Sequence, residues 1–253
     1  YIPISGIHGD NVVSVSKNMN WYQGPSLLKL LEDIELADQT SGPQPFRMPV
    51  QLVNRPNSDF RGVSGKPASG YILVNDEIAV FPSGKKTRIK EIITPSGATE
   101  KSLPGQSITL TFKDEIDCSR GQVISSSNSP LEVSDQLETT MIWMHENAMV
   151  PGRSYHLKIG CLELQASCAQ PKYKINIETN ERTAAKNLEL NEIGVVIITT
   201  IHEIPFTSYQ ESRDLGGFIL IDKSSNITVA AGLINFALRR SQNIHWQNTD
   251  VTK

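Results

Sequence analysis

The chain has 253 residues, of which 38% are apolar and 20% charged, so it is long enough to bury a substantial core. Its formal net charge of −3 argues against general nucleic-acid binding, for which a basic footprint is expected, but it does not exclude a local basic patch. No apolar run approaches the roughly 18 residues of a membrane-spanning helix. The three cysteines lack CxxC spacing, so we expect buried free thiols in a reducing cytoplasm.

The chain opens on an apolar, strand-like segment over residues 1–4, which runs directly into a Ser-Gly turn. A terminal strand needs neighbouring strands to pair with its backbone. The segment therefore raises the question of which sheet it belongs to.

A helix is predicted over residues 25–34. Its apolar residues recur at helical spacing and share one face. The residues on that face are Leu27, Leu30, Leu31 and Ile34. Pro25 suits the first helical position, where its missing N–H is not needed, and Gly24 is then the predicted N-cap. The polar, turn-forming segment 37–45 is typical of a linker.

After the linker, apolar and polar residues alternate with a period of two, which indicates half-buried strands. The alternation begins at Val50 and Leu52 and recurs over 107–112 and 162–168. Further strands are predicted over residues 77–81, 88–94, 140–144, 173–179, 194–201, 217–222 and 227–236. A polar break at 125–130 separates two groups of roughly 80–110 residues, so we expect two closed antiparallel barrels or sandwiches.

Candidate catalytic and metal-binding residues are few. The sequence has no GxxxxGK[ST] phosphate loop, no GxSxG elbow and no HExxH pair. Its five histidines lack ligand spacing, and the carboxylates of 114–117 are predicted to form a solvated turn. In the basic segment 84–90, Lys86, Arg88 and Lys90 would share one strand face. That face is either solvated or a surface for an acidic partner or an RNA backbone.

Residues 45–92 resemble the second domain of translational GTPases such as elongation factor Tu. The shared features are an FRMPV opening strand, the Arg61-Gly62 step and the V-x-D-E motif of 74–77. The resemblance implies a mainly β fold with two consecutive antiparallel β-barrels, elongation factor Tu-like domains II and III. The barrels would be preceded by the C-terminal strand and helix of a truncated α/β G domain.

Several stretches are similar, more specifically, to the GTPase subunit of sulfate adenylyltransferase. They are residues 9–35, 53–62, 114–121, 150–160, 190–194 and 208–229. The motifs VNRPNSDFRG and WYQGPSLL are not general elongation-factor features. Residues 236–253 resemble the joint of bifunctional forms, in which this subunit continues into an adenylylsulfate kinase domain. Cys118 departs from the pattern, because a β-branched apolar residue is expected there.

The resemblance also implies domain boundaries and a nucleotide contact. The implied segments are a G-domain remnant over 1–36, domain II over 45–126, domain III over 135–238, and a linker toward a kinase domain over 239–253. Ser5, Gly6 and Ile7 match the fifth guanine-nucleotide motif, whose backbone N–H groups lie beside the guanine ring and reach its O6. The phosphate loop, switch regions and NKxD motif are expected before Tyr1.

The implied activity is synthesis of adenylylsulfate and pyrophosphate from ATP and sulfate, coupled to GTP hydrolysis because the product lies uphill. GTP and Mg²⁺ are the cofactors implied for the longer protein. Neither is expected to be bound to this chain. The chain is also expected to hold no catalytic residue and no metal ligand.

The implied partners are a smaller catalytic adenylyltransferase subunit, the protein's own G domain and the kinase domain, in the cytoplasm, without nucleic acid or membrane. Two alternatives stay open: tRNA-binding barrels of a translation factor, and a non-catalytic protein-interaction module.

Overall fold

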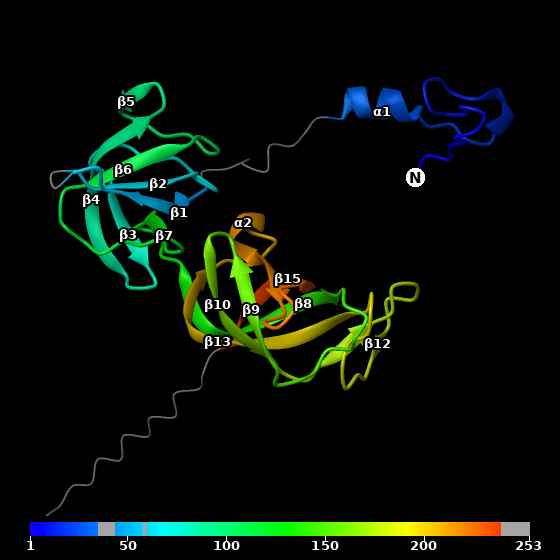
Figure 1. Ribbon diagram of the computed structural model, residues 1–253. Helices are drawn as coiled ribbons and strands as arrows, with labels where there is room; N and C mark the ends of the chain where they lie inside the picture. Colours follow the sequence, from blue (N-terminus) through cyan, green and yellow to red (C-terminus); the bar gives the residue numbers. More distant parts are fainter. Residues whose placement is uncertain (35–43, 58–59, 239–253) are drawn as a thin grey trace, which may run out of the picture. The chain divides into compact units, whose positions relative to one another are not determined.

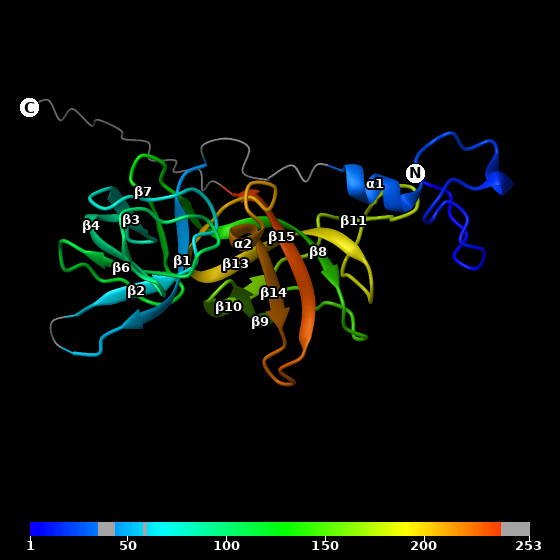
Figure 2. The same cartoon turned by 90° about the horizontal axis from the view of Figure 1, so that it is seen from above.

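A computed structural model describes residues 1–34, 44–57 and 60–238, and its elements are labelled in Figures 1 and 2. The contacts divide the chain into two compact units, Tyr1–Pro43 and Gln44–Lys253. In the described part, no helix has both the length and the apolar character needed to cross a membrane. Most of the predicted linker 37–45 and all of the predicted linker 239–253 lie outside the described residues.

The first unit is held together by polar contacts. It contains a 3-10 helix, η1 (Lys17–Met19), and one α-helix, α1 (Leu27–Asp33). Asn11 is buried, and its Nδ2 donates to the carbonyl of Pro3 (2.9 Å) while its Oδ1 accepts from the N–H of Ser16 (2.8 Å). The carbonyl of Asn11 also accepts from the N–H of Leu27 (2.9 Å), which ties α1 to this loop.

The predicted helix forms, but it starts at Leu27 and its N-cap is Ser26 rather than Gly24. The hydroxyl of Ser26 accepts a hydrogen bond from the N–H of Lys29 (3.3 Å), a bond that glycine has no side chain to make. Pro25 therefore precedes the cap. Residues 1–4 pair with no strand within the described residues, and the nearest pairing is an isolated bridge between Ser5 and Asp10.

The first barrel is built from seven strands, whose neighbours are all antiparallel. They are β1 (Arg47–Asn54), β2 (Gly62–Gly65), β3 (Glu77–Phe81), β4 (Lys85–Thr94), β5 (Gly97–Thr99), β6 (Ile108–Phe112) and β7 (Val123–Ser126). The hydrogen-bonded order is β3-β7-β1-β2-β6-β4, and β4 pairs back with β3, which closes the ring. Met48, Val50 and Leu110 lie in its core with no exposed surface.

The second barrel follows the same principle with longer strands (Figures 1 and 2). Its elements are β8 (Glu132–Trp143), β9 (Ser154–Ile159), β10 (Leu162–Cys168), β11 (Tyr173–Ile175), β12 (Arg182–Thr183), β13 (Ile193–Phe206), α2 (Arg213–Gly216), β14 (Gly217–Ile221) and β15 (Thr228–Ala237). The order is β10-β9-β14-β15-β8-β13, and β10 pairs with β13 to close the ring. Leu188, Val196 and Leu220 are fully buried inside it.

The predicted mainly β fold with two barrels is confirmed, and the strands predicted over 77–81 and 162–168 match β3 and β10. The strand predicted over 173–179 ends at Ile175. Beyond it the chain turns, because Asn176 Oδ1 accepts from the N–H of Glu178 (2.9 Å) and Asn180 adopts a left-handed φ of 60°. The period-two pattern missed β9, although Tyr155, Leu157 and Ile159 alternate there.

Candidate functional site

The three residues predicted to lie beside guanine occupy one exposed turn. The N–H of Ser5 donates to the carbonyl of Asp10 (3.2 Å), and the N–H of Gly9 donates to the carbonyl of Ser5 (2.8 Å). The hydroxyl of Ser5 accepts from the N–H of His8 (3.3 Å). These bonds close the loop around Gly6 and Ile7, and the Ile7 side chain is 92% exposed.

The same turn leaves backbone donors free. Within the described residues, the N–H groups of Gly6 and Ile7 donate to no protein acceptor. A Cβ built on Gly6 would meet no atom within 4 Å, so the backbone is open to a flat ligand. Two free amides on an exposed turn fit a ring carbonyl such as guanine O6, so the residues present are compatible with the predicted contact.

The two barrels meet at a contact region that we call the barrel seam, formed by Arg47, Glu211 and an apolar cluster. Arg47 lies on β1, and its Nη2 is 3.0 Å from Oε1 of Glu211, which precedes α2. The Arg47 side chain is only 8% exposed. Burial lowers the pKa of Arg47, and the charge of Glu211 acts in the opposite direction. The guanidinium still stays protonated, because its ordinary pKa is far above neutrality.

The apolar part of the barrel seam joins residues from both rings. It consists of Ala79, Phe81, Val123, Leu131 and Leu215, with Val133 packed against them. The first three come from β3 and β7, whereas Leu215 comes from α2 of the second barrel. The barrel seam therefore joins the two barrels through noncovalent contacts of both kinds, one ion pair and one apolar cluster.

A cleft of about 650 Å³ lies between the barrels. Pro82 and Arg120 line it from the first barrel, and Leu162, Ile201 and Ile204 line it from the second. Ile201 is 58% exposed and lies where the pairing of β13 with β8 shifts register, between Thr199 and Ile204. Its apolar walls suit an apolar surface of a ligand or partner more than a charged reactant.

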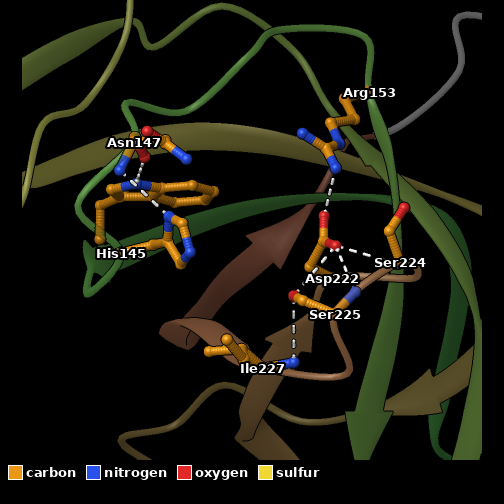
Figure 3. A network of polar contacts seen from close by, with 8 residues as sticks. His145, Asn147, Arg153, Asp222, Ser224, Ser225 and Ile227 are labelled. Atoms are coloured by element: carbon orange, nitrogen blue, oxygen red, sulfur yellow. Dashed lines mark hydrogen bonds and ion pairs between the residues drawn. The ribbon is translucent and has the colours of Figure 1, made fainter.

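A polar network stabilises one end of the second barrel (Figure 3). Asp222 forms an ion pair with Arg153, and its Oδ1 accepts from the N–H groups of Ser224 (2.9 Å) and Ser225 (3.0 Å). The N–H of Ser225 is the largest cause that lowers the pKa of Asp222, and burial opposes it. Both carboxylate oxygens of Asp222 are thus occupied by groups of the protein itself, and the network orders the hairpin turn between β14 and β15.

Trp143 and His145 form the neighbouring part of this network. The indole Nε1 donates to the carbonyl of Asn147 (2.7 Å), and Nδ1 of His145 accepts from the N–H of Asn147 (3.1 Å) (Figure 3). A cavity of about 200 Å³ lies among these side chains. Across the described residues, no group of three or more His, Cys, Asp or Glu side chains is arranged to hold a metal ion.

The other sequence-predicted features are found at the surface. Lys86, Arg88 and Lys90 are exposed on β4, while Thr87 and Ile89 between them are buried, as the alternation predicted.

The carboxylates of 114–117 follow the end of β6, and Asp114 Oδ2 accepts from Thr87 Oγ1 (2.9 Å). All three cysteines are free, but only Cys118 and Cys168 are buried. Cys161 is half-buried, because it lies at the hairpin tip between β9 and β10.

Two closed antiparallel barrels in tandem define the fold class of domains II and III of elongation factor Tu-like GTPases. Residues 136–235 match the family described as GTP-eEF1A C-terminal domain-like. The crystal structure of sup35 complexed with GMPPNP shares the fold, with a TM-score of 0.72 and 22% identity, and the match covers 94% of this chain and 59% of that chain.

Within that class the chain is similar, over its whole length, to sulfate adenylyltransferase subunit 1 and to two bifunctional enzymes. The bifunctional enzyme NodQ of a Rhizobium species is 44% identical over 252 residues, which cover 100% of this chain and 40% of that protein. The bifunctional enzyme CysN/CysC of Xylella fastidiosa is 40% identical over 99% of this chain and 40% of its own length. Sulfate adenylyltransferase subunit 1 of Colwellia psychrerythraea is 40% identical over 100% of this chain and 58% of its own length. The predicted resemblance is thereby confirmed, and the chain spans between 40% and 58% of these relatives.

Proposed function

We propose that this chain is part of a GTP-hydrolysing regulatory subunit of sulfate adenylyltransferase, which couples GTP hydrolysis to sulfate activation. The observation that carries the proposal is the similarity to sulfate adenylyltransferase subunit 1. The sequence identity is 40% and the match covers 100% of the chain, so it includes both units. A likeness confined to the barrels would support only a fold.

In the proposed reaction, a sulfate oxygen forms a bond to the α-phosphorus of ATP, and the bond from that phosphorus to the bridging β-oxygen breaks. Adenylylsulfate and pyrophosphate are the products. This chemistry belongs to a smaller catalytic subunit. Sulfate is a poor nucleophile and the product anhydride lies uphill, so hydrolysis of GTP to GDP and phosphate supplies the missing free energy.

We place the parts of this chain as follows in the longer protein: a G-domain remnant over 1–36, domain II over 45–126, domain III over 135–238 and a linker to an adenylylsulfate kinase domain over 239–253. The names of the bifunctional relatives support a second activity in the same polypeptide. The three free thiols fit a cytoplasmic location, where disulfides are rare.

The proposed nucleotide contact is the turn of Ser5, Gly6 and Ile7. Its two free N–H groups would donate to guanine O6, each worth about 0.5–1.5 kcal/mol net. Micromolar affinity needs about 8 kcal/mol, so this turn selects the base but cannot bind GTP alone. Mg²⁺ and a phosphate-binding loop supply the remaining affinity in this class of GTPases, and we place both in the part of the protein before Tyr1.

The barrel seam would give the barrels their coupling role. An ion pair at 3.0 Å and an apolar cluster hold the barrels together, so a movement imposed on one barrel is passed to the other. The proposed partners are the G domain and the smaller catalytic subunit.

The first test is calorimetric titration of the 253-residue chain with GTP and Mg²⁺. We expect no heat of binding at micromolar concentration, because the phosphate contacts are missing. Saturable micromolar binding would overturn the domain assignment.

The second test is pyrophosphate release by the chain rejoined to its G domain and mixed with the smaller subunit. We expect release to require both sulfate and GTP, and full activity without this chain would refute the proposal. In the same assay, Ser5→Ala should raise the KM for GTP several-fold with little change in kcat, because it loosens the turn. The matched control is Ser96→Ala, at an exposed hairpin turn of the first barrel.

A pull-down separates the proposal from its two alternatives. The chain is immobilised and offered the smaller adenylyltransferase subunit and aminoacyl-tRNA. Retention of the subunit alone supports the proposal. Retention of tRNA favours a translation-factor role, and retention of neither leaves an interaction module with another partner.

A further inference from the structure

Three arginines from two distant segments converge on one pocket of the first barrel. The pocket has a volume of about 380 Å³ and is lined by Arg55, Arg61 and Arg120, with Gln51, Leu52 and Cys118. Arg55 follows β1 and Arg61 directly precedes β2, whereas Arg120 lies in the loop between β6 and β7. We call this site the arginine pocket.

A β-bulge in β1 lies at the wall of the pocket, because Gln51 and Leu52 line it. The register between β1 and β2 shifts between Val50 and Leu52, so Val50 is fully buried while Leu52 is 56% exposed. The loop that carries Arg120 is bonded to β1 at this bulge, since Gly121 N–H donates to the Val50 carbonyl (2.9 Å). Bulges of this kind re-aim side chains and recur beside functional sites.

Arg61 is left without a good acceptor. Its side chain is 28% exposed, and its Nη2 lies 3.8 Å from Oδ1 of Asp117, whose own side chain is 89% exposed. Its Nε is buried and has no hydrogen-bond partner among the described residues. The charge of this partly desolvated guanidinium is therefore compensated by one long contact alone among the described residues, and an exposed carboxylate compensates it weakly.

The other two arginines are exposed, and the fold orients one of them, Arg120. Nη1 of Arg120 donates to the carbonyl of Gln51 (2.6 Å), which holds that guanidinium against β1 and leaves its other N–H groups free to donate. Cys118 adds no negative charge, because burial raises the pKa of its thiol to about 11 although Arg61 acts against that rise.

We propose that the arginine pocket binds a tetrahedral oxyanion, namely a sulfate or phosphate group. Guanidinium forks match the oxygen spacing of such groups and bind them through paired, charge-assisted hydrogen bonds. The anion would neutralise Arg61, and the exposed Asp117 carboxylate can swing into solvent to admit it. This assignment is independent of the proposed function, because it rests only on the geometry of the first barrel.

The test is a titration of the 253-residue chain with sodium sulfate and with sodium phosphate, against sodium chloride at equal ionic strength. Arginine side-chain N–H resonances report the occupied residue directly. We expect a saturable shift of the Arg61 Nε–H signal with sulfate or phosphate and none with chloride. A shift that rises linearly without saturation, or equally with chloride, would overturn the proposal.

Two variants and a matched control locate the site. Arg120→Gln and Arg55→Gln remove one charge each at exposed positions, and each should weaken anion binding about tenfold. The control is Arg88→Gln, which removes the same charge from the exposed face of β4, outside the pocket. Equal weakening by Arg88→Gln would show that only the general surface charge attracts the anion.

Further arms identify what carries the oxyanion. AMP that binds more tightly than phosphate points to a nucleotide ligand, and equal affinity points to the free anion; both outcomes agree with the proposal. If an RNA oligonucleotide binds to the chain but sulfate and phosphate do not, the proposal is overturned in favour of a site for a nucleic-acid backbone.

Discussion

The first unit and the two barrels bury different kinds of residue. Among residues 1–34 the only buried side chains are Asn11 and Ser26, and both are polar. No apolar residue of this stretch is buried, and Trp21 is 73% exposed and Leu31 60%. The barrels instead enclose continuous apolar clusters with almost no exposed surface.

The contrast shows what closure does for a fold. A closed ring partners the backbone of every strand and covers one face of each from inside, so it needs no other element. An amphipathic helix such as α1 covers nothing by itself, and its apolar face gains stability only against another surface. The first unit is therefore ordered by hydrogen bonds and caps, and the barrels by burial.

Hydrogen exchange should show the largest difference. We expect the amides of residues 1–34 to exchange at least about a thousandfold faster than those of β8 and β13, because local opening of a unit without an apolar core costs little. Mass-spectrometric exchange of the 253-residue chain measures both regions together. Equal protection in α1 and β13 would show that the first unit is self-sufficient.

Truncation of one core side chain and one helix side chain sharpens the comparison. Ile198 on β13 is fully buried, so Ile198→Ala should lower the free energy of unfolding by about 2–5 kcal/mol. Leu31→Ala, at a site that is 60% exposed, should change it by less than about 0.5 kcal/mol. Urea denaturation gives both values, and a similar cost at the two sites would refute the distinction.

The barrel seam should contribute less than either core. Arg47→Ala removes a buried stem and its ion pair, and should cost about 2 kcal/mol. Glu211→Gln keeps the packing at a site that is 54% exposed, so solvent screening should limit its cost to about 1 kcal/mol or less. Thermal unfolding measures the loss of stability in each variant. A larger loss for Glu211→Gln than for Arg47→Ala would mean that charge, rather than burial, holds the barrels together.

The smallest effect is expected from pH. The pKa of Asp222 is lower in the folded chain than in the unfolded chain, so its stabilising contribution is present above the ordinary carboxyl pKa of about 4. That contribution is lost as pH falls through the lowered pKa. Asp222→Asn should therefore flatten the acid side of the stability curve, at pH values below the ordinary carboxyl pKa of about 4. An unchanged acid limb would show that Asp222 does not set it.

Sequence patterns located most elements, because side-chain period is a local property. The alternation in β4 placed Lys86 and Arg88 outside and Thr87 inside, as the structure has them. The helix prediction succeeded for the same reason, but its start is wrong by two residues, because the hydroxyl of Ser26 caps the helix and Gly24 has no side chain to do so. Short strands such as β2 escaped, since Gly62–Gly65 is too short to show a period.

The sequence alone determined the barrel number, the amphipathic helix, and the family resemblance, since all three depend on residue type and spacing along the chain. Only the tertiary structure decided three other features. The β1 bulge sends Leu52 outward although it lies two residues from the buried Val50. Ring closure brings Arg120 to the pocket of Arg61, and barrel contact pairs Arg47 with Glu211 across 164 positions of sequence. The physical reason is that register shifts and ring closure depend on backbone pairing between distant strands, which a local residue pattern does not encode.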